Sequence, residues 1–261
     1  MKDADTKRQE IMTCQPLNNQ STILSDERKI PCRLDDERHS RLVESNQEGV
    51  HPDLEEAVLK YLNLPFLRPV AAHTQMAFDE ANGFISLFSK PVILDSGCGT
   101  GESTRVLAHK FPENPVIGLD KSLQRLSKSE QSKFPPNAKL LRAELLDFWK
   151  LILEAHWNVA YHALYYPNPW PKKAQLGRRF HAHPIFPTLL KLCPNLELRT
   201  NWEIYAREFE YAASLAMPRL NIPMRPLLES WTPDVPETAF ERKYLASGHV
   251  LWRVIFLSLS L

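Results

Sequence analysis

The sequence has few cysteines, and their scatter excludes two kinds of site. Its 261 residues contain four, Cys14, Cys32, Cys98 and Cys193, and no two of them form a CxxC pair. This spacing argues against a zinc site and against a disulfide scaffold, so we expect no metal. Scattered thiols also fit a reducing cytoplasm. Because Cys98 has no histidine or second cysteine near it in sequence, we expect a packed thiol rather than a nucleophile.

Long apolar runs are absent as well. No run approaches the roughly 18 residues that a membrane-spanning helix needs. The first residues, MKDADTKRQE, lack the apolar centre of a signal peptide. These absences predict a soluble, cytoplasmic protein without a membrane partner. The sequence does not choose between a monomer and a homodimer.

The chain also lacks an excess of charge of either sign. Lys and Arg number 32, Asp and Glu number 31, and the formal net charge is +1. Such a chain has no global basic field, so a nucleic-acid partner would have to be held by a local basic patch.

The composition divides the chain into two parts. Residues 1–50 are polar and densely charged and show no sustained apolar period, which predicts a flexible charged N-terminal tail. From residue 51 the apolar content rises, and we expect one folded domain over 51–261. Its first helix is predicted at 53–64, where Leu54, Val58, Leu59 and Leu62 have helical spacing.

Short apolar runs then alternate with helical patterns. We expect strands at 91–96, 115–120, 138–144, 159–166 and 196–200, and helices at 102–111, 122–134, 145–155, 183–193 and 201–216. This alternation predicts the α/β class, with a doubly wound, mostly parallel sheet of the Rossmann-like kind. The last stretch, 239–261, contains two β-rich runs around Ser247-Gly248, and it predicts an antiparallel C-terminal hairpin at the sheet edge.

A glycine loop follows the first predicted strand. The run VILDSGCGTGES places Gly97, Gly99 and Gly101 where ligands bind in open parallel sheets. The spacing is not the G-x-G-x-x-G dinucleotide fingerprint, because Glu102 occupies the position needed, and the absence of GK[ST] excludes a P-loop. A generic tight turn is the alternative interpretation.

Three acids follow the same strands. Asp120 ends the second strand, where a carboxylate can accept hydrogen bonds from ribose hydroxyls, although it could instead be a helix N-cap. Glu144 ends the third strand and could reach an adenine amino group, and Asp95 ends the first and could face a positive charge. Together they predict a site for a nucleoside without phosphates, which suits S-adenosylmethionine better than NAD.

A rigid basic segment, YYPNPWPKKAQLGRRFHAHP, follows the fourth strand. Trp170 is either a core aromatic or a wall against a ligand. We expect four basic residues to contact RNA phosphates, although a solvated loop face is the alternative: Lys172, Lys173, Arg178 and Arg179.

These motifs together resemble one known family. The D-x-G-x-G-x-G loop, PNPWPKKAQLGRR, TNWEIYA and the closing TAFERKYLASGHVLWRV are similar to those of the bacterial tRNA (guanine-N7-)-methyltransferases, from about Pro91 to Phe256. The resemblance implies a class I fold, S-adenosylmethionine as methyl donor, and tRNA as substrate, methylated at guanine 46 in the variable loop. It implies donor contacts at Asp95, Asp120, Glu144 and Asn168, alongside Gly97, Gly99 and Gly101. It implies a guanosine site at Lys172, Asn201 and 238–241, and RNA contacts at 174–179.

Two positions depart from the family pattern. Asn168 and Asn201 stand where the family usually has an acid, and both would lie near the chemistry. Guanine N7 has a lone pair and no proton, so catalysis is mostly positioning and desolvation, and no general base is needed. An asparagine keeps a carbonyl acceptor, but it cannot stabilise the positive charge that methylation leaves on the purine. We therefore expect retained but slower activity, or a shifted substrate.

Two further acids have a structural alternative. Thr238 and Glu241 form T-x-x-E, which is either a helix capping box or, as the resemblance implies, a contact with the guanine edge. Glu203 falls in the first turn of a predicted helix, where the helix dipole alone favours an acid.

Other functions stay open from the sequence alone. The chain could be a methyltransferase with a different acceptor, because Asn168-Pro169-Trp170 resembles the N-P-P-Y motif of enzymes that methylate exocyclic amines. It could also be a non-catalytic module that binds the donor or RNA. A hydride-transfer enzyme is disfavoured by the glycine spacing.

Overall fold

The structure is a computed structural model, which describes residues 40–43, 45–64, 66–129 and 134–259. Of the predicted N-terminal tail, residues 1–39 and 44 lie outside the described part. Two helices precede the sheet, α1 (Leu54–Leu62), which was predicted, and α2 (Ala72–Ile85), which was not. No helix of the described ranges is long and apolar enough to cross a bilayer.

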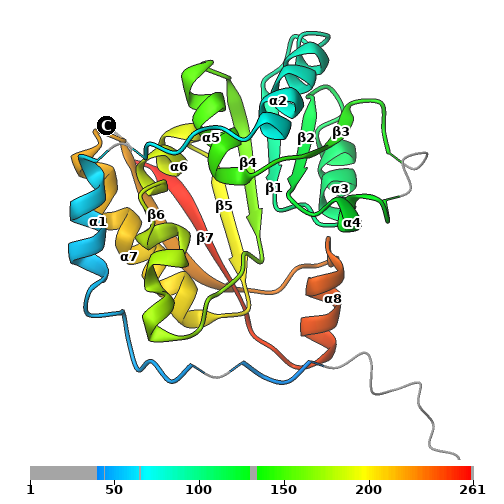
Figure 1. Ribbon diagram of the computed structural model, residues 1–261. Helices are drawn as coiled ribbons and strands as arrows, with labels where there is room; N and C mark the ends of the chain where they lie inside the picture. Colours follow the sequence, from blue (N-terminus) through cyan, green and yellow to red (C-terminus); the bar gives the residue numbers. More distant parts are fainter. Residues whose placement is uncertain (1–39, 44, 65, 130–133, 260–261) are drawn as a thin grey trace, which may run out of the picture. The chain divides into compact units, whose positions relative to one another are not determined.

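The domain is built on one seven-stranded sheet with the order β3-β2-β1-β4-β5-β7-β6. Five strands run parallel to one another: β1 (Val92–Ser96), β2 (Val116–Asp120), β3 (Ala138–Arg142), β4 (Val159–Tyr165) and β5 (Leu196–Thr200). The predicted α/β fold with a mostly parallel sheet is therefore confirmed. In Figure 1, β4 lies between β1 and β5 at the centre of this sheet.

The antiparallel edge is confirmed, but one of its strands was assigned wrongly. The edge consists of β6 (Met224–Trp231) and β7 (Leu251–Ser258), and β7 also pairs with β5. The run expected as the first strand of the hairpin forms α8 (Ala239–Ala246) instead. Thr238 and Glu241 form a complete capping box at its start, which satisfies backbone N–H groups and fixes the helix.

Alternate residues of the central strands pack on opposite faces of the sheet, as the two-residue period of a strand requires. Leu94, Ile117 and Leu164 belong to a large core with α1, α2, α5 (Leu145–Glu154), α6 (Phe186–Leu192) and α7 (Glu203–Arg219). Ile93, Val116 and Ala163 pack with α3 (Glu102–Lys110) on the other face. Both faces are therefore covered, so the strands read as continuous apolar runs.

Two connections at the carboxyl edge differ from what the sequence suggested. The helix predicted over 122–134 is the single turn α4 (Leu123–Leu126), which Ser122 caps by accepting from Arg125 N–H, and residues 130–133 lie outside the described part. The basic segment after β4 forms two 3₁₀ turns, η2 (Lys173–Arg178) and η3 (Phe180–Ala182). These connections leave the edge near β1, β2 and β4 available for a site.

Residues before α1 are held against the domain. Ser40 N–H donates to Ser247 Oγ at 2.8 Å, and Gln47, which is 8% exposed, bonds to the carboxylate of Glu208. His51 N–H donates to the same carboxylate at 3.0 Å. Residues 45–51 therefore contact α7 through buried polar groups.

Candidate active site

A cavity of about 430 Å³ opens beyond the carboxyl ends of β1, β2 and β4. This is the edge at which ligands bind in open α/β sheets. Its lining brings together six of the residues that the sequence suggested, Gly97, Asp120, Glu144, Asn168, Trp170 and Arg178, and also includes Tyr166 and Pro167. We call this space the donor cavity.

The glycine loop forms one wall of the donor cavity with bare backbone. Of its three glycines Gly97 lines the cavity, and Gly99 and Gly101 do not. Gly97 and Gly99 have φ of +86° and +61°, and a Cβ added at either would meet nothing within 4 Å. The loop is tied to the next strand, because Gly97 N–H and Cys98 N–H both donate to Leu119 O, at 2.8 and 2.9 Å. Open backbone in a conformation that favours glycine allows a ligand to approach closely.

Asp120 is held in place by the loop that it faces. Its carboxylate accepts from Gly99 N–H at 3.0 Å and from Ser122 N–H at 2.7 Å, and Arg125 Nη2 lies 3.2 Å away. The N-cap of α4 is Ser122, so the capping alternative for Asp120 does not apply. A carboxylate has about four acceptor positions, and Arg125 is half-exposed, so Asp120 keeps capacity for a ligand.

Glu144 lines the same cavity from the end of β3. It is the N-cap residue of α5 but makes no side-chain capping bond, and its backbone N–H donates to Thr74 Oγ1 at 3.0 Å. Its half-buried carboxylate has no hydrogen-bond partner among the residues that the structure describes. Glu144 and Asp120 therefore give the cavity two acids on neighbouring connections.

Asp95 does not line the donor cavity, although the sequence suggested a contact with a positive charge. It is 1% exposed, and its Oδ2 accepts from Ser103 Oγ at 2.7 Å and from Thr104 Oγ1 at 2.6 Å. Burial raises the pKa of Asp95 to about 6. Through these hydrogen bonds the Asp95 side chain connects the first turn of α3 to β1.

Residues 166–171, which we call the proline block, contribute another wall of the donor cavity. Tyr166 and Trp170 have φ of +50° and +47°, conformations that non-glycine residues seldom adopt. Tyr166 N–H donates to Arg199 O at 2.7 Å, which joins the block to β5, and Trp170 N–H donates weakly to Asn168 Oδ1 at 3.4 Å. Trp170 is half-buried and lines the cavity, so it is a wall rather than a core aromatic.

The four basic residues of the segment have different surroundings. Lys172 and Lys173 are exposed. Arg178 is also exposed, and its guanidinium lies over the Trp170 ring, 4.8 Å from the centroid. Arg179 is only 1% exposed, so it does not present its charge to a surface-bound phosphate. The local positive charge therefore comes from three of the four.

Arg179 belongs to a buried polar cluster that sequence reasoning missed. Its Nη1 donates to Glu208 of α7, which is 0% exposed, and its Nε donates to Trp170 O at 3.2 Å. His181 Nε2 lies 3.0 Å from the same carboxylate, and burial lowers the pKa of His181. We call Gln47, Arg179, His181 and Glu208 the buried cluster. It links residues before α1 to the wall of the donor cavity.

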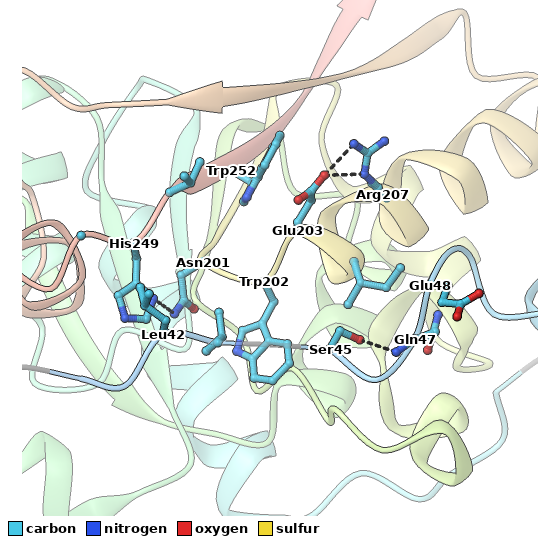
Figure 2. A pocket seen from close by; sticks show the side chains of 14 residues that line it. Leu42, Ser45, Gln47, Glu48, Asn201, Trp202, Glu203, Arg207, His249 and Trp252 are labelled. Atoms are coloured by element: carbon cyan, nitrogen blue, oxygen red, sulfur yellow. Dashed lines mark hydrogen bonds and ion pairs between the residues drawn. The ribbon is translucent and has the colours of Figure 1, made fainter.

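A second cavity of about 510 Å³ lies at the end of β5. Asn201 lines it and donates from Nδ2 to His249 Nδ1 at 3.1 Å, and Trp202 and Trp252 form two of its walls (Figure 2). Asn168 does not line this cavity, and Asn201 does not line the donor cavity. The structure therefore separates the two asparagines that the sequence placed together.

Thr238 and Glu241 line neither cavity. In the capping box one Glu241 oxygen accepts from Thr238 N–H at 3.3 Å, and the same oxygen accepts from Glu237 N–H at 2.6 Å. The other oxygen accepts from Arg199 Nη1 at 2.9 Å. Glu241 is fully buried. The Arg199 guanidinium lies 3.9 Å from the Tyr165 ring centroid and 4.2 Å from that of Trp231. Glu241 is therefore engaged in holding α8 to β5.

The described residues contain no cluster of three or more His, Cys, Asp or Glu side chains that could hold a metal ion. Cys98 and Cys193 are both buried free thiols. Burial raises the pKa of Cys193 to about 12 and that of Cys98 well above its ordinary value. A packed thiol at Cys98 agrees with the sequence-based expectation.

Comparison with known proteins gives matches to methyltransferases. Residues 89–254, more than half of the chain, match the Methyltransf_4 family, which is described as "Putative methyltransferase". The chain is 28% identical over 180 residues to the tRNA (guanine-N(7)-)-methyltransferase of Neisseria meningitidis serogroup A / serotype 4A, covering 64% of this chain and 72% of that protein. It is 28% identical over 184 residues to the protein of the same name from Bordetella pertussis, covering 64% and 66%. The solved structure of the aminoglycoside resistance methyltransferase NpmB1 has a TM-score of 0.48 and 19% identity, covering 69% of this chain and 93% of that one.

Proposed function

We propose, from the premise that the chain belongs to the Methyltransf_4 family of methyltransferases, that it transfers a methyl group from S-adenosylmethionine to N7 of a guanine in tRNA. The relatives named tRNA (guanine-N(7)-)-methyltransferase support the acceptor. The observation that carries the proposal is the donor cavity, where bare glycine backbone and two acids lie opposite a basic, proline-rigid wall.

The residues of the donor cavity fit this methyl donor. Gly97 and Gly99 leave the space that a Cβ would fill, so the backbone can approach the ligand closely. Asp120 would accept hydrogen bonds from the ribose hydroxyls, and Glu144 would accept from the adenine amino group. When bound, S-adenosylmethionine supplies an electrophilic methyl group. The absence of a Walker-type lysine disfavours a nucleoside phosphate. Asp120 and Glu144 supply acceptors for a nucleoside, and of the three cations that also line the cavity, Lys121, Arg125 and Arg178, Arg125 is paired with Asp120.

Asn168 is proposed to orient the acceptor guanine beside Trp170. Guanine N7 needs no base to remove a proton, so the chain has to bind, align and exclude water. The Asn168 carbonyl accepts only a weak bond from Trp170 N–H, at 3.4 Å, and the side chain is exposed. It is therefore free to accept a hydrogen bond from the base. Trp170, fixed between two prolines, excludes water from one side of the cavity.

Lys172, Lys173 and Arg178 are proposed to contact RNA phosphates. All three are exposed in a chain whose net charge is only +1, and Arg178 lines the donor cavity. Contacts of this kind supply affinity and position the RNA without reading its sequence. Arg179 is left out of this set, because Glu208 neutralises it in the interior.

The function is tested by incubating the purified chain with labelled S-adenosylmethionine and tRNA that lacks N7-methylguanosine, followed by nucleoside analysis of the product. We expect label in N7-methylguanosine. Asp120→Asn and Glu144→Gln should raise the KM for the donor and leave the KM for tRNA little changed, because their side chains face the donor cavity. Label in another nucleoside, or none with donor binding intact, would contradict the proposal.

A methyltransferase with a different acceptor is the second candidate, and Asn168 favours it. An asparagine cannot stabilise the cationic product as an acid would, but it can hold an exocyclic amino group. The same nucleoside analysis separates the two, since the labelled nucleoside would then carry its methyl on an amine. A large gain of tRNA methylation in Asn168→Asp would also favour the second candidate.

A further inference from the structure

The second cavity is assembled from three stretches that lie far apart in the sequence. Residues 42, 43, 45, 47 and 48 precede α1, residues from 201–207 follow β5, and residues from 248–252 lead into β7. The volume of about 510 Å³ falls within the roughly 300–1,000 Å³ of small-molecule sites. The proposed methyl transfer uses none of these residues.

Two indole rings supply flat apolar surface inside this cavity. Trp202 and Trp252 pack against the hydrophobic core but are only half-buried, so part of each side chain remains accessible at the cavity that both line. In Figure 2 the two rings lie on different sides of the cavity, and Asn201 lies between them. Neither indole N–H has a hydrogen-bond partner among the described residues, whereas those of Trp149 and Trp157 do. Exposed aromatic faces of this kind stack on nucleic-acid bases.

The polar groups of the cavity suit the edge of a base. Asn201 donates from Nδ2 to His249 Nδ1 at 3.1 Å, which leaves its carbonyl oxygen as an acceptor toward the cavity side. Ser45 Oγ accepts from Gln47 N–H at 3.1 Å, and its hydroxyl proton stays available as a donor. A base presents both donors and acceptors, so a neutral mixed lining can bind it.

The charge of the lining disfavours a phosphate. Glu48 and Glu203 are acids, and Arg207 is occupied by Glu203, with Nε–Oε1 at 2.8 Å and Nη2–Oε1 at 2.6 Å. No unpaired Lys or Arg lines the cavity within the described ranges. The phosphates of a bound strand would therefore lie outside, toward exposed lysines such as Lys172 and Lys173.

The two cavities lie on one edge of the sheet. β4 and β5 are paired parallel neighbours, and the donor cavity lies at the carboxyl end of β4 while the second lies at that of β5. Adjacent strands are about 4.8 Å apart. A strand of RNA running along this edge would pass both. A guanine placed at Asn168 would not fill the second cavity, because Asn168 does not line it.

We propose that the second cavity binds an unpaired base of the RNA that neighbours the methylated guanine, stacked against Trp202 and Trp252 and contacted by Asn201. The inference rests on the proposed function, because it takes RNA as the substrate. It assigns Asn201 to recognition of the RNA and removes it from the methyl-transfer step.

The test is a double-mutant cycle between the full-length chain and the RNA, read as the Kd for tRNA. Synthetic tRNAs carry one abasic nucleotide at the guanine or at each neighbouring position in turn. The variants are Trp252→Leu, which removes the ring, Trp252→Phe, which keeps one, and Leu87→Ala, a surface control outside both cavities.

We expect one neighbouring abasic position to weaken wild-type binding roughly tenfold. In Trp252→Leu the same abasic position should have no further effect, because ring and base contact each other. Trp252→Phe should restore most of the coupling, and the donor KM should be unchanged in all variants. A merely structural role for Trp252 would instead raise the donor KM and lower binding of every tRNA equally.

Two outcomes overturn the inference. In one, no abasic position couples to Trp252; in the other, only the methylated guanine itself does, which would assign the cavity to the acceptor base. The proposed function fails separately, when wild-type chain binds tRNA but transfers no methyl to guanine N7. Because the cycle measures binding, it still decides the role of the second cavity in that case.

Discussion

Glu208 should be a residue whose loss is costly although it touches no ligand. Its carboxylate accepts from Arg179, His181, Gln47 and His51 N–H, and both Arg179 and Glu208 are at most 1% exposed. Removing one member of a buried ion pair leaves the other charge uncompensated, which costs about 3–5 kcal/mol. We expect Glu208→Ala to lower the free energy of unfolding by that amount.

The assay is equilibrium urea unfolding followed by far-UV circular dichroism. For a domain of this size, the expected loss corresponds to a Tm lower by roughly 6–20 °C. Glu208→Gln keeps the volume and one acceptor, so its cost should be smaller, about 1–3 kcal/mol. Glu210→Ala is the matched control on α7, because Glu210 has no ion-pair partner in the described part of the chain, and it should stay within about 0.5 kcal/mol of wild type.

The pH dependence gives a second check on the same cluster. Burial alone would raise the pKa of Glu208, but bonds from His181, Gln47 and Arg179 hold it at about 2. A carboxyl whose folded pKa is depressed contributes stability above its unfolded pKa and loses it as the pH falls toward the folded one. The gap between wild type and Glu208→Ala should therefore narrow from about pH 4.5 down to about pH 2.

The double variant Arg179→Met with Glu208→Leu separates charge from packing. Each single variant leaves one buried charge without its partner, whereas the double variant removes both charges. The double variant should therefore be more stable than either Arg179→Met or Glu208→Leu alone. Two results would refute the reasoning. One is a Glu208→Ala that unfolds within about 1 kcal/mol of wild type with an unchanged m value. The other is strict additivity of the two single effects.

Three further predictions follow from other sites. Burial raises the pKa of Asp95 to about 6, so the stability that Asp95 contributes is complete below about pH 4 and is lost as the pH rises through 6. Asp95→Asn should therefore gain stability relative to wild type between pH 4 and pH 7 in urea titrations. A difference in unfolding free energy that stays constant over this range would contradict the prediction. A Cβ at Gly118 would lie 2.4 Å from Thr104 Oγ1 and 2.5 Å from Leu140 Cδ2, so Gly118→Ala should lower the free energy of unfolding by about 1–3 kcal/mol, measured by thermal unfolding. As a control, Gly83→Ala in α2, where a Cβ would meet nothing within 4 Å, should be neutral or stabilising. Arg178→Leu removes a proposed phosphate contact and also a cation 4.8 Å from the Trp170 centroid, so it should raise the KM for tRNA and, roughly two- to fivefold, the KM for the donor, while Lys173→Leu should change only the KM for tRNA; equal effects of both on the donor KM would argue against the position of Trp170.

The parallel part of the sheet could be predicted because its strands are buried on both faces. Runs such as 91–96 and 196–200 are short, continuously apolar and bounded by turn residues, which is the pattern of a central parallel strand. The edge was harder. The run 239–246 is rich in aromatics and was assigned to a strand, yet the T-x-x-E signal at Thr238 and Glu241 already marked a helix start. Here a local capping signal outweighs β-propensity.

The donor side of the site was predictable for the same local reason. Gly97, Asp120 and Glu144 directly follow strands, and the carboxyl ends of parallel strands meet at one edge. Arg179 could not be placed this way, and although Asn201 directly follows β5, the cavity that it lines could not be predicted. Arg179 is buried because it pairs with Glu208, which belongs to another element, α7. The sequence did contain one signal of this pair, since Glu208 lies three residues after Tyr205 and four before Ala212, on the buried side of α7. The walls around Asn201 come from residues before α1 and beyond α8, which no local pattern connects.

The two asparagines have different consequences because they lie in different cavities. The acids that remain at the edge, Asp120 and Glu144, both line the donor cavity, so negative charge is retained where a cationic donor would bind. Asn168 lines the cavity where the guanine would become cationic, and the guanidinium of Arg178, which also lines it, has the same sign as that charge and cannot stabilise it. Asn201 is hydrogen-bonded to His249 and does not line the donor cavity. The electrostatic cost of the departures from the family pattern therefore falls on one residue, Asn168, while the change at Asn201 alters hydrogen bonding in the second cavity and leaves the charge at the reacting base unaffected.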